Sequence, residues 1–187
     1  MEGNTPSQWK NVGYAAYGVA ILFLIRIPFY FIPGLREATA INSPFLGELN
    51  ALTGVAPHLL LFPVVAALPA PRWARAAGYG WLVIDMTTDI MQLSGVASTI
   101  FLSVRYGGHI SAAVWIAASA WQIKGAMRVV GLLLALDLVI YTFVSPFGPI
   151  FLLVFLPALV LLPLWFALVG RLLVRNNKDQ QVLTEIG

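Results

Sequence analysis

The stretch from Gly78 to Ser103, GYGWLVIDMTTDIMQLSGVASTIFLS, decides how this chain is interpreted. It is apolar enough to cross a membrane, yet at about 100° per residue its polar side chains fall within a sector of roughly 100° on one side of a helix. They are Asp85, Thr88, Asp89, Gln92, Thr99 and Ser103, interrupted only by Val96. An ionised carboxylate near the bilayer centre costs about 2.5–3.5 kcal/mol even on the translocon-insertion scale. We therefore expect this side of the helix to face a cavity, a ligand or polar partners.

The composition places the whole chain among membrane proteins. Of its 187 residues, 59% are hydrophobic and only 10% are charged, whereas soluble domains carry about 25% charged residues. The absence of Cys excludes disulfides and thiolate metal sites, and two histidines, His58 and His109, are too few for a multi-histidine metal cluster. The basic residues lie at the ends of apolar segments, where the membrane surface explains them. We expect membrane lipids as partners, no metal and no nucleic acid.

Six apolar segments follow one another along the chain. Pairing them in order predicts an all-α integral membrane protein with six transmembrane helices arranged as three hairpins, at about 11–33, 44–69, 76–103, 110–123, 126–144 and 149–170. The fourth is short enough to be a re-entrant segment instead. Ser43 and Pro44 are typical of the N-cap and first position of the second helix. A polar N-terminal segment (1–10) and a polar C-terminal tail (171–187) flank the membrane domain (11–170).

The basic residues predict the orientation of these spans. With six spans, one side of the membrane has only Arg36 and Arg105, and the other has Lys10, Arg72, Arg75, Lys124, Arg128, Arg171, Arg175 and Lys178. Because basic loops stay on the cytoplasmic side, this 8:2 division predicts that both termini are cytoplasmic in a multi-pass protein of the cell membrane.

Four ionisable residues, His58, Asp85, Asp89 and Asp137, are expected at similar depth in the middle of the membrane, as judged from a rise of about 1.5 Å per residue. Asp85 and Asp89 lie one turn apart. Two such carboxylates resist being ionised together, which suits a proton carrier or a cation site. The alternative is that they form hydrogen bonds with neighbouring helices and only hold the helices together.

Arg26 and Glu48 lie nearer the outer side. Arg26 is expected to pair with Glu48 across the first hairpin, or alternatively to hold a carboxylate or phosphate of a substrate. His58 is either a proton-relay partner of the aspartates or a structural histidine, and we expect no haem because His109 is predicted at the opposite membrane edge. The candidate residues for binding a substrate or ion are Arg26, Glu48, His58, Asp85, Asp89, Gln92, Trp115, Gln122, Asp137 and Tyr141.

Three functions are compatible with this polar layer. We favour a small transporter or channel that binds a small solute, a proton or a cation at the intramembrane carboxylates, beside helices bent by proline. The alternatives are an intramembrane enzyme acting on a lipid or isoprenoid, with an aspartate as general acid or base, and a non-catalytic membrane subunit or ligand-binding protein. No motif indicates a cofactor or a catalytic residue. The apolar sixth segment is expected to contact lipid, a second copy of the chain or a partner subunit.

Overall fold

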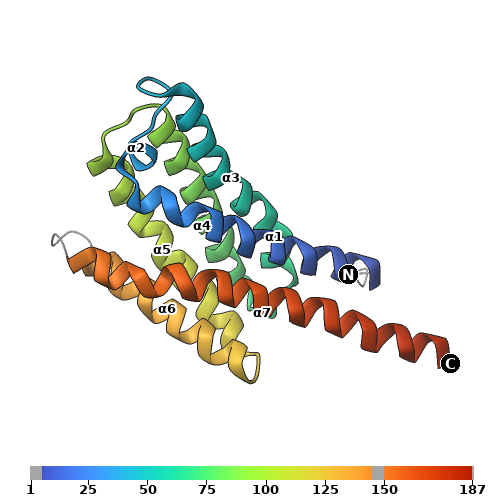
Figure 1. Cartoon of the computed structure of the whole chain (residues 1–187). Helices are drawn as coiled ribbons and strands as arrows, with labels where there is room; N and C mark the ends of the chain where they lie inside the picture. The colour runs from blue at the N-terminus through green and yellow to red at the C-terminus, as the bar shows by residue number, and fades with distance from the viewer. Residues whose placement is uncertain (1–5, 145–149, 187) are drawn as a thin grey trace.

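The computed structural model describes residues 6–144 and 150–186, and all regular structure within these ranges is helical. The helices, labelled in Figure 1, are α1 (Pro6–Phe31), α2 (Pro33–Arg36), α3 (Pro44–Ala67), α4 (Arg72–Leu93), α5 (Ser98–Trp121), α6 (Ala126–Val144) and α7 (Ile150–Ile186). Each long helix packs against the next long helix in the chain, and α7 returns to pack along α1. The six long helices therefore form a closed ring in chain order, with α2 at one end.

The outside of this ring is apolar, and its inside holds buried polar side chains within a hydrophobic core. Side chains such as Leu24, Leu52, Leu136 and Val160 are more than half exposed. The buried polar side chains include Arg26, His58, Asp85 and Asp89. This distribution, the reverse of a soluble protein, suits a chain surrounded by lipid.

Within the described part of the chain, five helices are long and apolar enough to cross a membrane: Gln8–Phe31, Pro44–Ala67, Ser98–Trp121, Ala126–Val144 and Leu153–Arg175. The apolar helices are thus consistent with an α-helical, multi-pass membrane protein. The helix missing from this set is α4, the polar helix of the opening stretch. Its 22 residues are about 33 Å long at 1.5 Å per residue, its acidic side chains face inward, and Val83 and Ile90 are exposed on its outer side. Six spans stay a prediction, which these features of α4 support.

The continuous helix predicted over 76–103 is wrong, because a glycine ends α4 after Leu93. Gly95 has a φ of 76°, in the left-handed region that favours glycine. Its N–H donates to the carbonyl of Gln92, and the N–H of Val96 donates to the carbonyl of Met91, both at 3.0 Å. This pair of hydrogen bonds is the Schellman motif that closes a helix. The predicted polar stripe is therefore divided, with Thr99 and Ser103 on α5.

The break moves two side chains from the membrane edge into the fold. Because α5 begins at Ser98 instead of at about residue 110, Arg105 lies inside a helix rather than in an exposed turn. His109 lies one turn further along the same helix. The short fourth span and its re-entrant alternative are therefore wrong, and α5 is 24 residues long.

The other helix bounds agree closely with the predictions at α3 and α6 and differ at the two ends of the chain. The spans expected at 44–69 and 126–144 are α3 and α6, with Pro44 in the first turn of α3 as predicted. The first helix begins at Pro6, and the last continues to Ile186 through the segment expected to be a polar tail. The turn expected at 145–149 lies outside the described residues.

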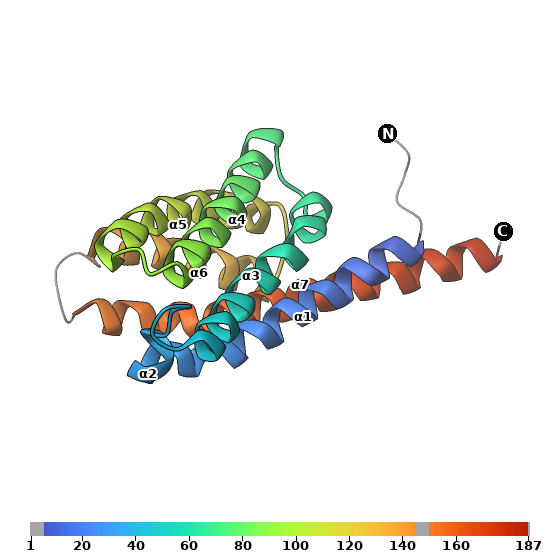
Figure 2. The same cartoon turned by 90° about the horizontal axis from the view of Figure 1, so that it is seen from above.

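The start of α1 and the end of α7 lie at the same end of the ring, as Figures 1 and 2 show. The two helices approach closely there, since a Cβ at Gly13 would lie 3.1 Å from the carbonyl oxygen of Gly170. An even number of membrane crossings would place the start of α1 and the end of α7 on the same side of the membrane. That this end is cytoplasmic stays a prediction from the basic residues.

Candidate functional site

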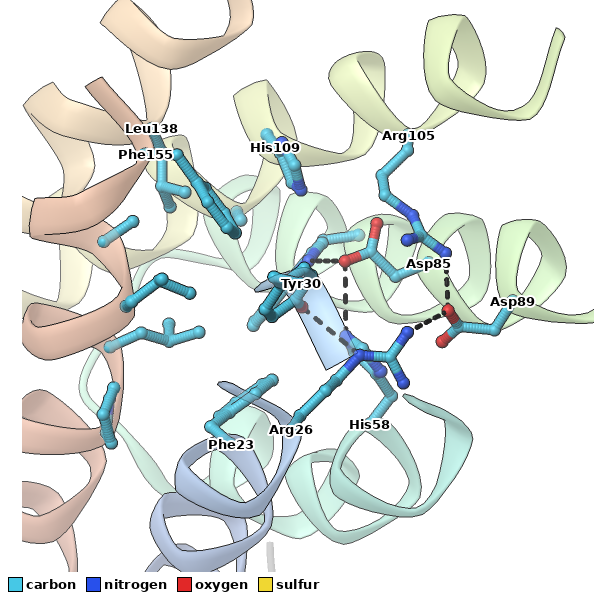
Figure 3. A pocket seen from close by; sticks show the side chains of 16 residues that line it. Phe23, Arg26, Tyr30, His58, Asp85, Asp89, Arg105, His109, Leu138 and Phe155 are labelled. Carbon is cyan, nitrogen blue, oxygen red and sulfur yellow. Dashed lines mark hydrogen bonds and ion pairs between the residues drawn. The ribbon is translucent and has the colours of Figure 1, made fainter. Parts of the chain in front are cut away.

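A cavity of about 70 Å³ lies at the centre of the ring, and all six long helices contribute to its wall (Figure 3). One side is polar, with Arg26 from α1, His58 from α3, Trp81, Asp85 and Asp89 from α4, and Arg105 and His109 from α5. The opposite side is apolar and comes from α6 and α7, with Leu138, Phe155, Ala158, Leu159 and Leu162. The cavity therefore offers one polar and one apolar wall to anything bound in it.

Arg26, Asp89 and Arg105, which we call the arginine–aspartate cluster, tie three helices together. Nη2 of Arg26 donates to Oδ1 of Asp89 at 2.9 Å, and Nη2 of Arg105 donates to the same oxygen. Arg105 also donates from Nε to the hydroxyl of Thr88 at 2.8 Å, and Arg26 donates from Nη1 to the carbonyl of Asn50 at 3.0 Å. With its carboxylate held between two guanidinium groups, Asp89 is fully neutralised inside the protein.

A glycine on α3 makes room for this cluster. A Cβ at Gly54 would overlap both Nη1 of Arg26 and the carboxylate of Asp89. The cluster can therefore lie flat against α3 only because residue 54 has no side chain.

Asp85 belongs to a second group, with His58 and Trp81. Its Oδ2 accepts a hydrogen bond from Nε1 of Trp81 at 2.8 Å and lies 3.3 Å from Nε2 of His58. On the other side of the imidazole, Nδ1 lies 2.6 Å from the carbonyl oxygen of Gly54. Because a carbonyl can only accept, this Nδ1 must carry a hydrogen.

The other ring nitrogen of His58, Nε2, lies 3.3 Å from Oδ2 of Asp85 and has no hydrogen-bond partner among the described residues. The two side chains are therefore in buried contact beside the cavity.

Three buried polar atoms of the cavity-lining residues have no hydrogen-bond partner among the described residues. They are Nε2 of His58, Oδ1 of Asp85 and Nδ1 of His109. Leaving a buried polar atom unsatisfied costs about 1–3 kcal/mol. A bound molecule or an ordered water would remove that cost, so these atoms mark where a ligand's polar group would lie.

Four of the predicted site residues meet at this cavity: Arg26, His58, Asp85 and Asp89. They do so in different pairs from those expected. The predicted ion pair between Arg26 and Glu48 is wrong, since Arg26 pairs with Asp89 and Glu48 is exposed. The expected competition between the two carboxylates is wrong too, because each has cationic or N–H partners of its own.

Two further predicted residues pack close to the cavity. Trp115 is fully buried, with its ring centroid 6.0 Å from that of Trp81. Tyr141 packs against His109 and Phe155, with ring centroids 5.4 and 5.0 Å away. Both support residues that line the cavity.

The remaining predicted residues lie elsewhere. Gln92 donates to the carbonyl of Arg36 at 2.9 Å and so attaches the end of α4 to α2. Gln122 is exposed at the end of α5, and Asp137, half-buried on α6, is not among the cavity-lining residues. Its neighbour Leu138 does line the cavity, so the similar depth predicted for Asp137 is not contradicted, but its side chain does not join those of His58, Asp85 and Asp89.

Sequence reasoning missed Arg105, His109 and Trp81. For Arg105 and His109 the sequence did contain a signal, because Ser94-Gly95 is typical of a helix end. If a new helix begins after it, Arg105 and His109 are four residues apart and share one helix face. The argument against haem from the position of His109 was wrong, because His109 and His58 line the same cavity. Among the described residues, no group of three or more histidine or acidic side chains could hold a metal ion.

Comparisons with protein-family models, with curated proteins and with solved structures find no match for this chain.

Proposed function

We propose that the protein is a small multi-pass membrane carrier that binds one solute in the cavity at the centre of its helix ring. The observation that carries this proposal is the cavity itself, bounded by all six long helices, with buried atoms of Asp85 and His109 lacking partners. Carriers commonly bind their substrates near the bilayer midplane, between helices that can rock against one another.

Prolines supply the flexibility that a carrier needs. Pro57 and Pro63 lie inside α3, and Pro157 and Pro163 lie inside α7. Each proline removes one backbone hydrogen bond and allows the helix to bend. Pro163 lines the cavity, so bending of α7 would change the shape of the site directly.

The charges favour a proton or a neutral solute over a metal cation. Asp89 is already neutralised by Arg26 and Arg105, and Asp85 already faces His58. An added cation would find no free negative charge. His58, which contacts Asp85 beside the cavity, is the group that we propose for coupling a proton to the binding of a solute.

The proposal includes six crossings with both termini in the cytoplasm of the cell, as the 8:2 division of basic residues supports. It also includes a second copy or partner subunit at α7, whose Leu153 and Val160 are strongly exposed. The other helices also have apolar outer faces, so this contact rests on the sequence alone.

The test has two steps. Native mass spectrometry of the protein purified in mild detergent is expected to detect one retained small molecule per chain. A labelled sample of that molecule is then expected to exchange across proteoliposome membranes. Ala112→Leu, which fills the cavity at a fully buried lining residue, is expected to abolish retention and exchange. Ala118→Leu, at a partly exposed position on the same helix, is the matched control and is expected to preserve both.

An intramembrane enzyme is the second candidate, because His58 with Asp85, and His109 beside the same cavity, could act as acid and base. Chemical conversion of the retained molecule without exchange would favour this enzyme. Retention with neither exchange nor conversion would favour a ligand-binding subunit. The carrier proposal would be refuted if no small molecule is retained, or if Ala112→Leu retains it as well as the wild type does.

A further inference from the structure

We infer that the cavity binds the hydroxyl group of a neutral amphiphilic alcohol, which donates its hydrogen to Oδ1 of Asp85. This inference rests on the proposed function, in so far as the cavity must be a ligand site, and it adds the chemical class of the ligand.

The unpartnered oxygen of Asp85 requires a donor. Asp85 is only 7% exposed, and its other oxygen already accepts from Trp81 and faces His58. Asp85 lines the cavity, and its Oδ1 has no hydrogen-bond partner among the described residues. A carboxylate oxygen accepts hydrogen bonds, so the group that completes it must carry N–H or O–H. Ketones, ethers and hydrocarbons do not.

The second unpartnered atom favours a group that both donates and accepts. Nδ1 of His109 belongs to the same cavity wall, and Figure 3 shows the side chains of His109 and Asp85 directed into the same space. A hydroxyl can donate to Asp85 and accept from a protonated Nδ1 of neutral His109. One small group thus satisfies both buried atoms.

The charge of the site excludes an ion. On the polar wall the charges of Arg26 and Arg105 balance those of Asp85 and Asp89. An ammonium or an anionic head group would therefore be buried there without a counter-charge, which is costly in a low-dielectric interior. An anionic head group would also bring a further acceptor to Oδ1 of Asp85. A neutral hydroxyl has neither cost.

The size and walls of the cavity indicate the rest of the molecule. At about 70 Å³ it is about half of the ~150 Å³ cavity that holds benzene in an engineered protein, so it accommodates a head group with a few carbons rather than a whole lipid. The apolar wall from α6 and α7 suits those carbons. Phe155 and Leu159 of this wall are partly exposed, which provides a side on which a longer chain can continue into the bilayer.

The experiment uses three photoactivatable probes that differ only in the polar group. A diazirine-bearing long-chain secondary alcohol, the ketone with the same carbon skeleton and the corresponding primary amine are added to the full chain in lipid nanodiscs, at matched concentrations in the membrane. Mass spectrometry of the labelled peptides reports occupancy at the cavity. We expect saturable labelling by the alcohol, and apparent affinities lower by tenfold or more for the ketone and the amine.

Asp85→Asn makes the test specific, because the geometry fixes the orientation of the new amide. Trp81 donates to the Oδ2 position, so the amide oxygen must lie there and the NH₂ group must replace Oδ1. The cavity then offers a donor, which an alcohol and a ketone both accept. We expect the preference for alcohol over ketone to fall to about one. Asp137→Asn, at an acidic residue outside the cavity lining, is expected to retain the preference of the wild type.

The outcomes distinguish failure of the hydroxyl inference from failure of the proposed function. Saturable cavity labelling that does not distinguish the three probes would overturn the hydroxyl inference while leaving the proposed binding site intact. An unchanged preference in Asp85→Asn, with the variant folded by circular dichroism, would also overturn it. Absence of saturable labelling with any probe would contradict the proposed function itself.

Discussion

Removal of the Asp89 carboxylate should destabilise the protein strongly, and removal of the whole arginine–aspartate cluster should not. Asp89 is 3% exposed and is the shared acceptor of Arg26 and Arg105. In Asp89→Leu two guanidinium groups stay buried without the carboxylate to which both donate. In the triple variant Arg26→Met, Asp89→Leu, Arg105→Met no charge is buried at this position.

The magnitudes follow from the cost of a buried unpaired charge. Removing one partner of a buried ion pair costs about 3–5 kcal/mol, whereas replacing the whole group by apolar side chains of similar volume is often neutral or stabilising. For a chain of 187 residues, 1 kcal/mol corresponds to about 2–4 °C in Tm. We therefore expect Asp89→Leu to lower Tm by about 6–20 °C and the triple variant to recover most of that loss.

Tryptophan fluorescence during heating provides the assay, since the chain has six Trp and Trp81 lies within the site. The variants are compared in one detergent or nanodisc preparation. Glu48→Leu is the matched control. It removes an acidic residue that is exposed on α3, and we expect a change within about ±0.5 kcal/mol.

Two results would refute this reasoning. If Glu48→Leu lowers Tm as much as Asp89→Leu does, the partner of Arg26 is the one suggested by the sequence rather than the one in the structure. If the triple variant is as unstable as Asp89→Leu, mutual neutralisation is not what the cluster contributes.

Two glycine substitutions give further predictions. Gly54→Ala places a Cβ inside the arginine–aspartate cluster. Because overpacking costs about 1–3 kcal/mol, this variant should lower Tm by several degrees. The control Gly80→Ala, with open space around residue 80, should leave Tm unchanged, and equal Tm values for the two variants would contradict the packing described at residue 54. Gly95→Ala puts a side chain on a backbone with φ of 76° and should destabilise the protein by about 1 kcal/mol or more, while Gly107→Ala inside α5, also in open space, should be neutral or slightly stabilising. A neutral Gly95→Ala in the same melting assay would argue against the break between α4 and α5.

The membrane class, the helical content and most helix bounds could be predicted because they depend on local properties. The residues of each segment determine its hydropathy and its 3.6-residue period independently of the other segments. The bounds of α3 and α6 were therefore predicted close to those observed. The inward position of Asp85 and Asp89 followed from similar reasoning, because a charged side chain that faces lipid is energetically costly. The one local signal that was misread, Ser94-Gly95, placed Arg105 and His109 outside the membrane core.

The partners of the polar groups could not be predicted, because they depend on how the ring closes. Arg26 and Asp89 are 63 residues apart in sequence. They meet where α1 and α4 both pack against α3, on which Gly54 leaves space beside them. Glu48, across the first predicted hairpin, was the partner expected for Arg26, and that expectation was wrong. The sequence by itself determined that this chain buries charges in an apolar, helical protein. Only the tertiary structure decided which charges neutralise one another, and that buried atoms of Asp85 and His109 have no hydrogen-bond partner among the described residues.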